Sequence, residues 1–238
     1  MKILSIDTST MLGSVALSDG DVLVAQEQQG VPGTHSERLL STVDHLLGLA
    51  RWKGGDLCGI AVATGPGSFT GLRIGLATAK GMALALGCRI AGVSSLASLS
   101  MNGASFAGTV VPLIDARRGE VYAAAYRSNG KGRLSRRMKE CALSPEDLIV
   151  KLMKIAGPLL LVGDGAKAFG ATLAKAIGSR AVVAAGAQLF PQAHNLAVAA
   201  LPFFAKGRGD DISSLAPNYI RRSDAEIVLD RKRGKGKI

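Results

Sequence analysis

A glycine-rich loop, Gly65–Gly71, carries the residue types in this chain that are best suited to bind an anion. It reads Gly-Pro-Gly-Ser-Phe-Thr-Gly and stands between an expected buried strand, 59–63, and an expected helix, Leu72–Leu86. Backbone N–H groups and the helix dipole attract anions at such a helix start. The spacing fits neither a P-loop nor a dinucleotide-binding Gly-x-Gly-x-x-Gly loop. Two interpretations stay open: a tight turn without a ligand, or a phosphate-facing loop formed by Gly65, Gly67, Ser68, Thr70 and Gly71.

A second candidate site lies at the end of the first expected strand. Asp7 is followed by Thr8, Ser9 and Thr10, so a carboxylate stands beside hydroxyl groups, as in a metal–phosphate site. The alternative is that Asp7, Thr8 and Thr10 tie the first turn together through hydrogen bonds from side chain to backbone. We favour this alternative, because no acid in the second half has an evident partner role.

The sequence indicates no metal site and no catalytic nucleophile. Its three histidines, His35, His45 and His194, form no His-x-x-x-His motif, and Cys58, Cys88 and Cys141 form no Cys-x-x-Cys pair. A zinc site or a disulfide framework needs closer spacing than this. No set of Ser, His and Asp or of Cys and His stands out either.

Two halves of the chain repeat one order of elements: three strands, a helix, a strand, a glycine loop, a helix and a strand. Asp19-Gly20 and Asn129-Gly130 mark the equivalent hairpins, since both types tolerate positive φ. Strands are expected at 2–7, 14–18, 21–28, 59–63, 89–92, 109–115, 120–127, 133–141, 159–162 and 181–185, and helices at 37–50 (with a Thr34–Glu37 capping box), 72–86, from Ser144, at 166–177 and at 192–206.

This order predicts an α/β protein with an actin-like fold. Two similar lobes, each with a mixed central sheet flanked by helices, face each other. The first lobe is expected at residues 1–106 and the second at 107–225, with a basic and disordered tail at 226–238.

Composition indicates a folded and soluble protein. Hydrophobic residues make up 47% of the 238 residues and charged residues 20%, which is enough for a buried core. No stretch has 18 uncharged apolar residues, and Asp7 interrupts the apolar start that a signal peptide needs. We therefore expect a cytoplasmic protein with no membrane segment.

The formal net charge of +11 has two local sources, the tail from Arg221 onward and a cluster of Arg133, Arg136, Arg137 and Lys139. One interpretation is a solvated surface, and the other is a phosphate-rich partner such as RNA. Aromatic residues are only 4%, and no RNA-binding aromatic motif is present. Sequence-specific base stacking by this chain alone is therefore not expected.

The expected helix Leu72–Leu86 is apolar on nearly every side. Such a helix must be buried on more than one side. Gly75, Ala79 and Ala83, spaced by four, would let another backbone approach closely. The covering element is either the neighbouring helix of the same lobe or a different chain.

Several motifs, taken together, resemble the TsaB (YeaZ) family of bacterial tRNA threonylcarbamoyladenosine proteins. The resemblance spans Lys2 to about Ala225, and its Gly65–Gly75 motif is highly specific. The motifs are Ile3–Thr10, Gly65–Gly75, Ala79–Ala83, Val93–Leu96, Ile114–Arg117 and Ala216–Arg221.

The resemblance implies a non-catalytic, actin-like subunit that pairs with the catalytic subunit TsaD, supports recruitment of the ATPase TsaE and meets tRNA through the complex. It also implies a homodimer when TsaD is absent. No cofactor is expected on this chain, with ATP and metal in the partner subunits. Carried onto this sequence, the pairing surface is Leu39, Leu40, Val43, Leu46, Leu47, Leu72, Ile74, Leu76 and Met82.

Two other functions stay open. One is an ATP-dependent kinase or carbamoyltransferase of actin-like fold that acts alone, with Asp7, Thr10 and Ser68 around a phosphate. The other is a peptidase, which the missing metal ligands and nucleophile disfavour.

Overall fold

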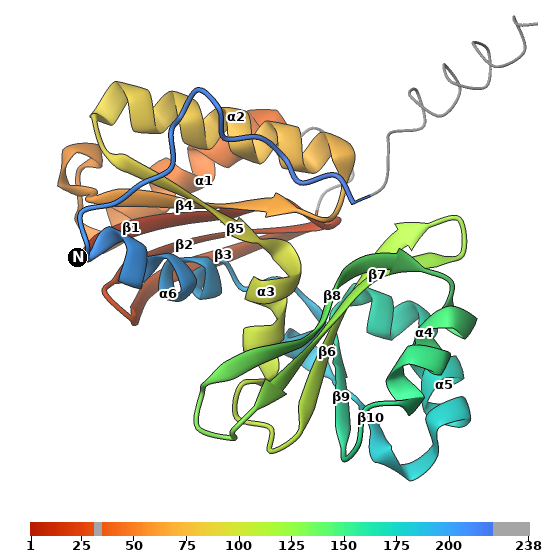
Figure 1. The fold of residues 1–238 in the computed structure, drawn as a ribbon. Coiled ribbons are helices and arrows are strands. Elements are labelled where there is room, and N and C mark those ends of the chain that lie inside the picture. The colour runs from red at the N-terminus through yellow and green to blue at the C-terminus, as the bar shows by residue number, and fades with distance from the viewer. Residues whose placement is uncertain (31–34, 221–238) are drawn as a thin grey trace, which may run out of the picture.

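The computed structural model describes residues 1–30 and 35–220. Two lobes follow one another along the chain, and each is built on a five-stranded sheet (Figure 1). The first half contains β1 (Lys2–Asp7), β2 (Leu12–Asp19), β3 (Val22–Gly30), α1 (His35–Ala50), β4 (Gly59–Gly65), α2 (Phe69–Leu86), β5 (Arg89–Ser94) and α3 (Ser95–Ser100). The second half contains β6 (Thr109–Arg117), β7 (Glu120–Ser128), β8 (Leu134–Leu143), α4 (Pro145–Met153), β9 (Leu159–Val162), α5 (Asp164–Ile177), β10 (Ala181–Val183) and α6 (Ala193–Phe204).

The two sheets have the same strand order. In the first it is β3-β2-β1-β4-β5, and in the second the equivalent order is β8-β7-β6-β9-β10. The first three strands of each sheet pair antiparallel and the remaining pairs are parallel. Gly20 and Gly130 turn two of the hairpins with φ of 62° and 73°. The repeated elements and the two-lobed actin-like fold expected from the sequence are therefore confirmed.

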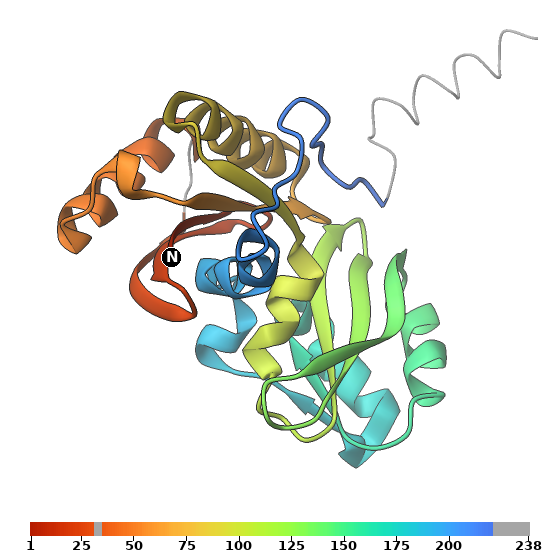
Figure 2. The ribbon, with the colours of Figure 1, turned by 60° about the vertical axis from the view of Figure 1, so that its left-hand side comes forward.

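Each sheet is covered by two helices of its own lobe and by one helix from the other half of the chain. Helices α1 and α2 pack against the first sheet, and α4 and α5 against the second. Helix α3 packs on the second sheet through Leu96 and Leu99. Helix α6 packs on the opposite face of the first sheet through Leu196, Ala200 and Phe204 (Figure 2).

This exchange of helices differs from the division expected from the sequence. The range 107–225 was assigned to the second lobe, yet α6 and the segment after it lie on the first. Helix periodicity gave no sign of the exchange, because an apolar stripe fits either sheet. Helix α3 was not expected. Pro202 lies inside α6.

Helix starts follow the capping residues more closely than the apolar pattern. Ser68 caps α2 by accepting a hydrogen bond from the Gly71 N–H, so the helix begins at Phe69, before the expected Leu72. Ser144 caps α4 in the same way. The expected Thr34–Glu37 capping box and the tail at 226–238 lie outside the described residues.

Within the described part of the chain, no helix has both the length and the apolar character needed to span a membrane.

Candidate partner surface and glycine loop

The glycine-rich loop joins β4 to α2, as expected, and the chain itself covers it. The Ser68 N–H donates to the Ser9 carbonyl oxygen at 2.7 Å. The Thr8 hydroxyl donates to the Gly71 carbonyl oxygen at 2.7 Å and lies almost fully buried. The turn after β1 therefore occupies the space beside the start of α2 that an anion would need.

Glycine is required in this loop because two backbones approach closely. A Cβ on Gly71 would lie 2.1 Å from the Thr8 carbonyl oxygen, and one on Gly67 would lie 2.3 Å from the Ser9 carbonyl oxygen. No side chain fits at such distances. The contacts explain the glycines by packing, so phosphate binding by Gly65, Gly67, Ser68, Thr70 and Gly71 stays a prediction.

Asp7 lies at the centre of the same turn and is 1% exposed. Its Oδ1 accepts hydrogen bonds from the Ser9 N–H at 2.9 Å and from the Ser9 hydroxyl at 2.6 Å. Burial raises the pKa of the Asp7 carboxyl, and the two bonds from Ser9 oppose that rise only in part. Thr10 is also used locally, since its hydroxyl donates to the Leu12 carbonyl oxygen at 2.9 Å.

In the second lobe, Asp115 and Asp164 lie together at the equivalent strand ends. The Asp115 N–H donates to Asp164 Oδ1 at 3.1 Å. Burial and then the charge of Asp115 raise the pKa of Asp164, while hydrogen bonds and Arg117 lower it. No group of three or more metal-ligating side chains occurs among residues 1–30 and 38–220, whose side chains the structure describes.

A contact that sequence reasoning missed joins the C-terminal segment to the glycine loop. The Asn218 N–H donates to the Thr64 carbonyl oxygen at 2.7 Å. Tyr219 packs its ring 5.0 Å from that of Phe69, and its hydroxyl accepts from Arg73 Nε at 3.0 Å. The available signal was the Ala216–Arg221 motif, whose place in the fold could not be read from its sequence.

Arg73 completes this cluster, because its guanidinium lies 3.8 Å from the centre of the Phe69 ring. Phe69 is 37% exposed and Tyr219 is 40% exposed. The start of α2 thus presents two aromatic rings and a cation on the outside of the first lobe.

The expected pairing surface must be corrected. Five of its nine residues belong to the interior of the first lobe, where a partner cannot contact them without unfolding it. These are Leu39, Val43, Leu46, Leu72 and Leu76, each at most 6% exposed. Of the remaining four, Leu47, Ile74 and Met82 are half-buried against the first core, and Leu40 is 55% exposed.

The exposed residues of α1 and α2 lie two positions further along the chain than several of the expected ones. Leu49 is 63% exposed on α1, and Leu84 is 68% exposed on α2. Ala77, Gly81 and Ala85, spaced by four, are exposed as well. Gly75, Ala79 and Ala83, the small residues expected to admit another backbone, are buried, with Gly75 against Thr8. The helix does have a small-residue stripe that faces outward, but its phase is shifted by two residues.

Comparison with known proteins gives consistent results. The sequence profile described as "TsaD: tRNA N6-adenosine threonylcarbamoyltransferase" matches residues 26–229. The chain is 35% identical over 238 residues to the tRNA threonylcarbamoyladenosine biosynthesis protein TsaB of Escherichia coli (strain K12), covering 98% of this chain and 100% of the relative. It is 34% identical over 227 residues to TsaB of Bacillus subtilis (strain 168), covering 95% and 96%.

The solved structure of YeaZ from Pseudomonas aeruginosa superposes with a TM-score of 0.74 at 30% identity, covering 92% of this chain and 99% of that one. Relatives of this identity match from end to end, and the lobes, the glycine loop and the exposed α2 face lie within the matched lengths. The chain therefore belongs to the TsaB family of tRNA threonylcarbamoyladenosine biosynthesis proteins.

Proposed function

We propose that this protein is a non-catalytic subunit of a tRNA threonylcarbamoyladenosine modification complex, where it supports a TsaD-type catalytic subunit by pairing with it. Family membership supports a role in making threonylcarbamoyladenosine in tRNA, since the relatives are named as biosynthesis proteins of that modification. The observation that carries the pairing role is the outer face of α2. There, three small residues, Ala77, Gly81 and Ala85, and the exposed Leu84 form a surface without a charged side chain.

This face has the properties of a helix-docking surface. Small residues on a helix let a second backbone approach closely, which increases dispersion contacts. Outside the backbone of its own helix, no described residue has an atom within 4 Å of where a Gly81 Cβ would stand, so another backbone could approach there. An exposed glycine inside a helix costs about 1 kcal/mol relative to alanine, so its presence favours a role in contact. Leu40 is a further exposed apolar side chain on the neighbouring helix α1.

The nearby polar groups supply a rim. Lys80 is turned away from the face, because its Nζ donates to the Ser213 carbonyl oxygen at 3.4 Å. At the start of α2 stands the Phe69, Arg73 and Tyr219 cluster, and aromatic and Arg side chains are enriched in protein interfaces. The proposed partner surface is therefore Leu40, Phe69, Arg73, Ala77, Gly81, Leu84 and Ala85.

A shared fold of this chain and the TsaD-type subunit also favours pairing through equivalent helices of the two proteins. A family profile described for the transferase itself matches this chain, so partner and chain share a fold. We further propose that TsaE joins this pair, that tRNA is met through the complex, and that two copies of this chain pair through the same face when no TsaD-type subunit is present.

The test is co-purification of the full chain with a TsaD-type subunit. Leu84→Glu and Leu40→Glu place an unpaired carboxylate in the proposed contact and should weaken pairing by more than about tenfold. Both side chains are exposed, so the monomer should keep its melting temperature. Leu76 is unsuitable for this test, because Leu76→Glu would bury the charge in the core.

Val150→Glu is the matched control, since Val150 is 58% exposed on α4, the helix of the second lobe equivalent to α1. It should leave pairing unchanged. Wild-type recovery of the partner with Leu84→Glu would exclude this face. If all three variants lost the partner equally, the effect would be one of solubility or charge and would not identify a surface.

A further inference from the structure

We infer that this chain contacts RNA directly, and that the outer edge of its second lobe is a docking surface for the phosphate backbone of that RNA. The inference rests on the proposed function, because that function supplies tRNA as the partner. We call this surface the basic edge. It consists of Arg127 at the end of β7, Lys131 and Arg133 in the following hairpin, and Arg136, Arg137 and Lys139 on β8.

The basic edge is strongly charged over a short length. Six cationic side chains and no acid occur between residues 127 and 139, and all six are exposed. The ion pairs found within the described residues involve Asp19, Glu27, Asp56 and Asp115, and none of them includes a residue of the basic edge. No carboxylate among the described residues therefore pairs with these charges.

The nearest acid along β8 is directed elsewhere. Glu140 accepts a hydrogen bond from the hydroxyl of Ser94. Ser94 is the last residue of β5, in the first lobe. Burial and then the charge of Glu140 raise the pKa of Tyr126 to about 12, whereas the charge of Arg136 lowers it. Glu140 thus serves the contact between the halves of the molecule and forms no ion pair with a described residue of the basic edge.

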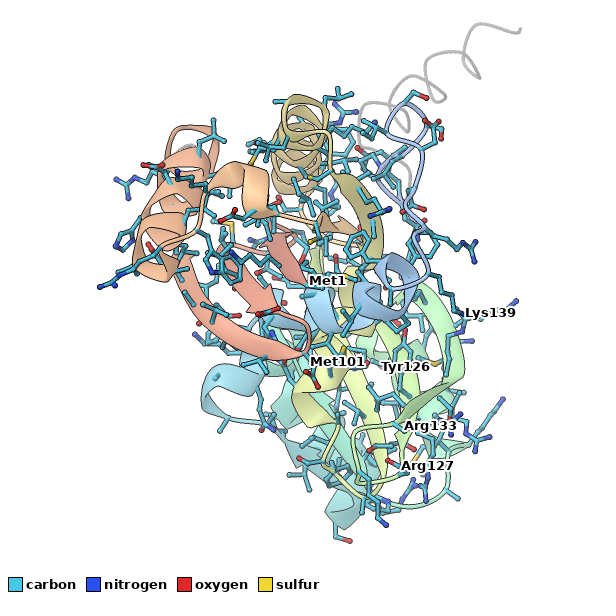
Figure 3. All side chains as sticks on the ribbon, turned by 90° about the vertical axis from the view of Figure 1, so that its left-hand side faces the viewer. Met1, Met101, Tyr126, Arg127, Arg133 and Lys139 are labelled. Atoms are coloured by element: carbon cyan, nitrogen blue, oxygen red, sulfur yellow. The ribbon has the colours of Figure 1, made fainter. Side chains whose placement is uncertain are left out.

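The geometry suits a nucleic-acid backbone. Strand β8 is the last strand of its sheet, so one of its sides has no neighbour among the described strands. Lys139, Arg133 and Arg127 follow one another down one side of the second lobe (Figure 3). At about 3.3 Å per residue, Arg133 to Lys139 spans roughly 20 Å, which is enough to run beside several phosphates of one nucleic-acid strand.

The hairpin end of the basic edge contains an open depression of about 490 Å³, lined by Ala107, Arg127, Ser128, Asn129, Arg133, Leu134 and Ser135. The two guanidinium groups and the side-chain N–H₂ of Asn129 are suitable donors for phosphate oxygens, whereas the Ser128 and Ser135 hydroxyls already donate to backbone carbonyl oxygens. Planar guanidinium groups bind phosphate in a two-pronged manner, so this depression is expected to hold one phosphate of the backbone more firmly than the rest.

The chemistry indicates contact with phosphates and not with bases. Tyr126 is 8% exposed, so its ring cannot stack on a base, and no other aromatic residue lies between 127 and 139. Phosphate contacts fix the position of a nucleic acid without reading its sequence. The basic edge would therefore hold a tRNA arm in place while another subunit selects the nucleotide.

The test measures binding of a labelled tRNA transcript to the purified full chain across a range of salt concentrations. Arg133→Ala, Arg136→Ala and Arg137→Ala combined should weaken binding by roughly tenfold or more at 0.15 M salt. They should also reduce the slope of log affinity against log salt by about 2, since each phosphate contact contributes about 0.7 to 0.9. These exposed substitutions should leave the melting temperature and co-purification with a TsaD-type subunit unchanged.

A matched triple variant, Lys167→Ala, Lys175→Ala and Lys206→Ala, removes the same charge from exposed positions elsewhere and should leave tRNA affinity within about twofold. Equal losses in both triple variants would overturn the inference, because net charge alone would then explain binding. It would also be overturned if only Arg231→Ala, Lys232→Ala and Arg233→Ala weakened binding, or if polyglutamate bound as tightly as tRNA. Loss of pairing in the Leu84→Glu variant with intact tRNA binding would separate the two proposals.

Discussion

Helices α2 and α5 occupy equivalent positions in the two lobes but expose different side chains. Helix α2 presents Ala77, Gly81, Leu84 and Ala85, whereas α5 presents Lys167, Thr172 and Lys175 among its alanines. Burying a lysine costs rotamer freedom and desolvation of the ammonium group, so Lys is depleted from interfaces. One fold, repeated twice, has thus produced a face suited to docking in the first lobe and a solvated face in the second.

The turns after β1 and β6 differ in a related way. Among the described residues, Asp7 is buried and its side chain is hydrogen-bonded only to Ser9. The Asp115 side chain is 25% exposed and lies 3.5 Å from an Arg117 guanidinium nitrogen. The glycine loop of the first lobe is closed over by Thr8 and Ser9. The comparison indicates that the motifs of the first lobe which most resemble a ligand site mainly serve packing.

The largest expected effect is on the glycine loop. Gly71→Ala brings a Cβ to 2.1 Å from the Thr8 carbonyl oxygen, whereas Gly165→Ala at the start of α5 meets Leu113 backbone at 2.9 Å. Gly71→Ala should lower the free energy of unfolding by about 3 kcal/mol or more, and Gly165→Ala by about 1–2 kcal/mol. Urea unfolding of both variants measures the difference. A neutral Gly71→Ala would mean that Thr8 does not close the loop in solution.

Asp7→Asn is expected to have a moderate effect with the opposite sign. The variant removes a buried charge but keeps an oxygen for the two bonds from Ser9, so the free energy of unfolding at pH 7 should rise by about 1 kcal/mol. In Asp115→Asn the lost attraction to Arg117 is offset by relief from Asp164, so stability should change by less than about 0.5 kcal/mol. Thermal unfolding of both variants provides the measurement.

If Asp7→Asn destabilised the protein instead, either the buried Asn N–H₂ would lack an acceptor or the carboxylate would be stabilised by a cation or another partner. In the second case, the active-site interpretation of the first turn would regain support.

The smallest expected effect concerns the two exchanged helices. Helix α6 carries His194, whose Nδ1 lies 2.9 Å from the Ser18 hydroxyl, while α3 carries no titratable side chain. Burial lowers the pKa of His194, against an opposing effect of Asp21. Because His194 binds a proton more readily in the unfolded chain than in the folded protein, protonation favours unfolding. The contribution of neutral His194 to stability is therefore present above pH 6.5, its ordinary pKa, and is lost as the pH falls below that value.

The melting temperature should therefore fall slightly between pH 7 and pH 5, and His194→Asn should flatten this part of the curve. Asn keeps an oxygen near the position of Nδ1, so the variant should remain folded. An unchanged pH profile in His194→Asn would show that His194 is not responsible. A steeper profile would contradict the direction of the pKa shift.

Much of the architecture was predictable from local sequence. Asp19-Gly20 and Asn129-Gly130 placed two hairpins, Ser144 with Pro145 placed the start of α4, and the repeated order of elements gave both lobes. These signals act over a few residues, where backbone sterics and capping bonds decide the conformation. An exposed apolar side of α2 was one of two alternatives that the sequence left open, and its residues were not identified.

By itself, the sequence determined most of the elements, their order and the family, because hydrophobic period, turn residues and specific motifs are local properties of the chain. Only the tertiary structure decided that Leu76 faces inward and Leu84 outward. The sequence of a helix that is apolar on nearly every side does not show which side packs against the sheet. The tertiary structure also decided that α6 crosses to the first lobe and that Asn218 reaches the glycine loop, about 150 residues away along the chain. Contacts of that separation depend on packing and leave no pattern in neighbouring residues.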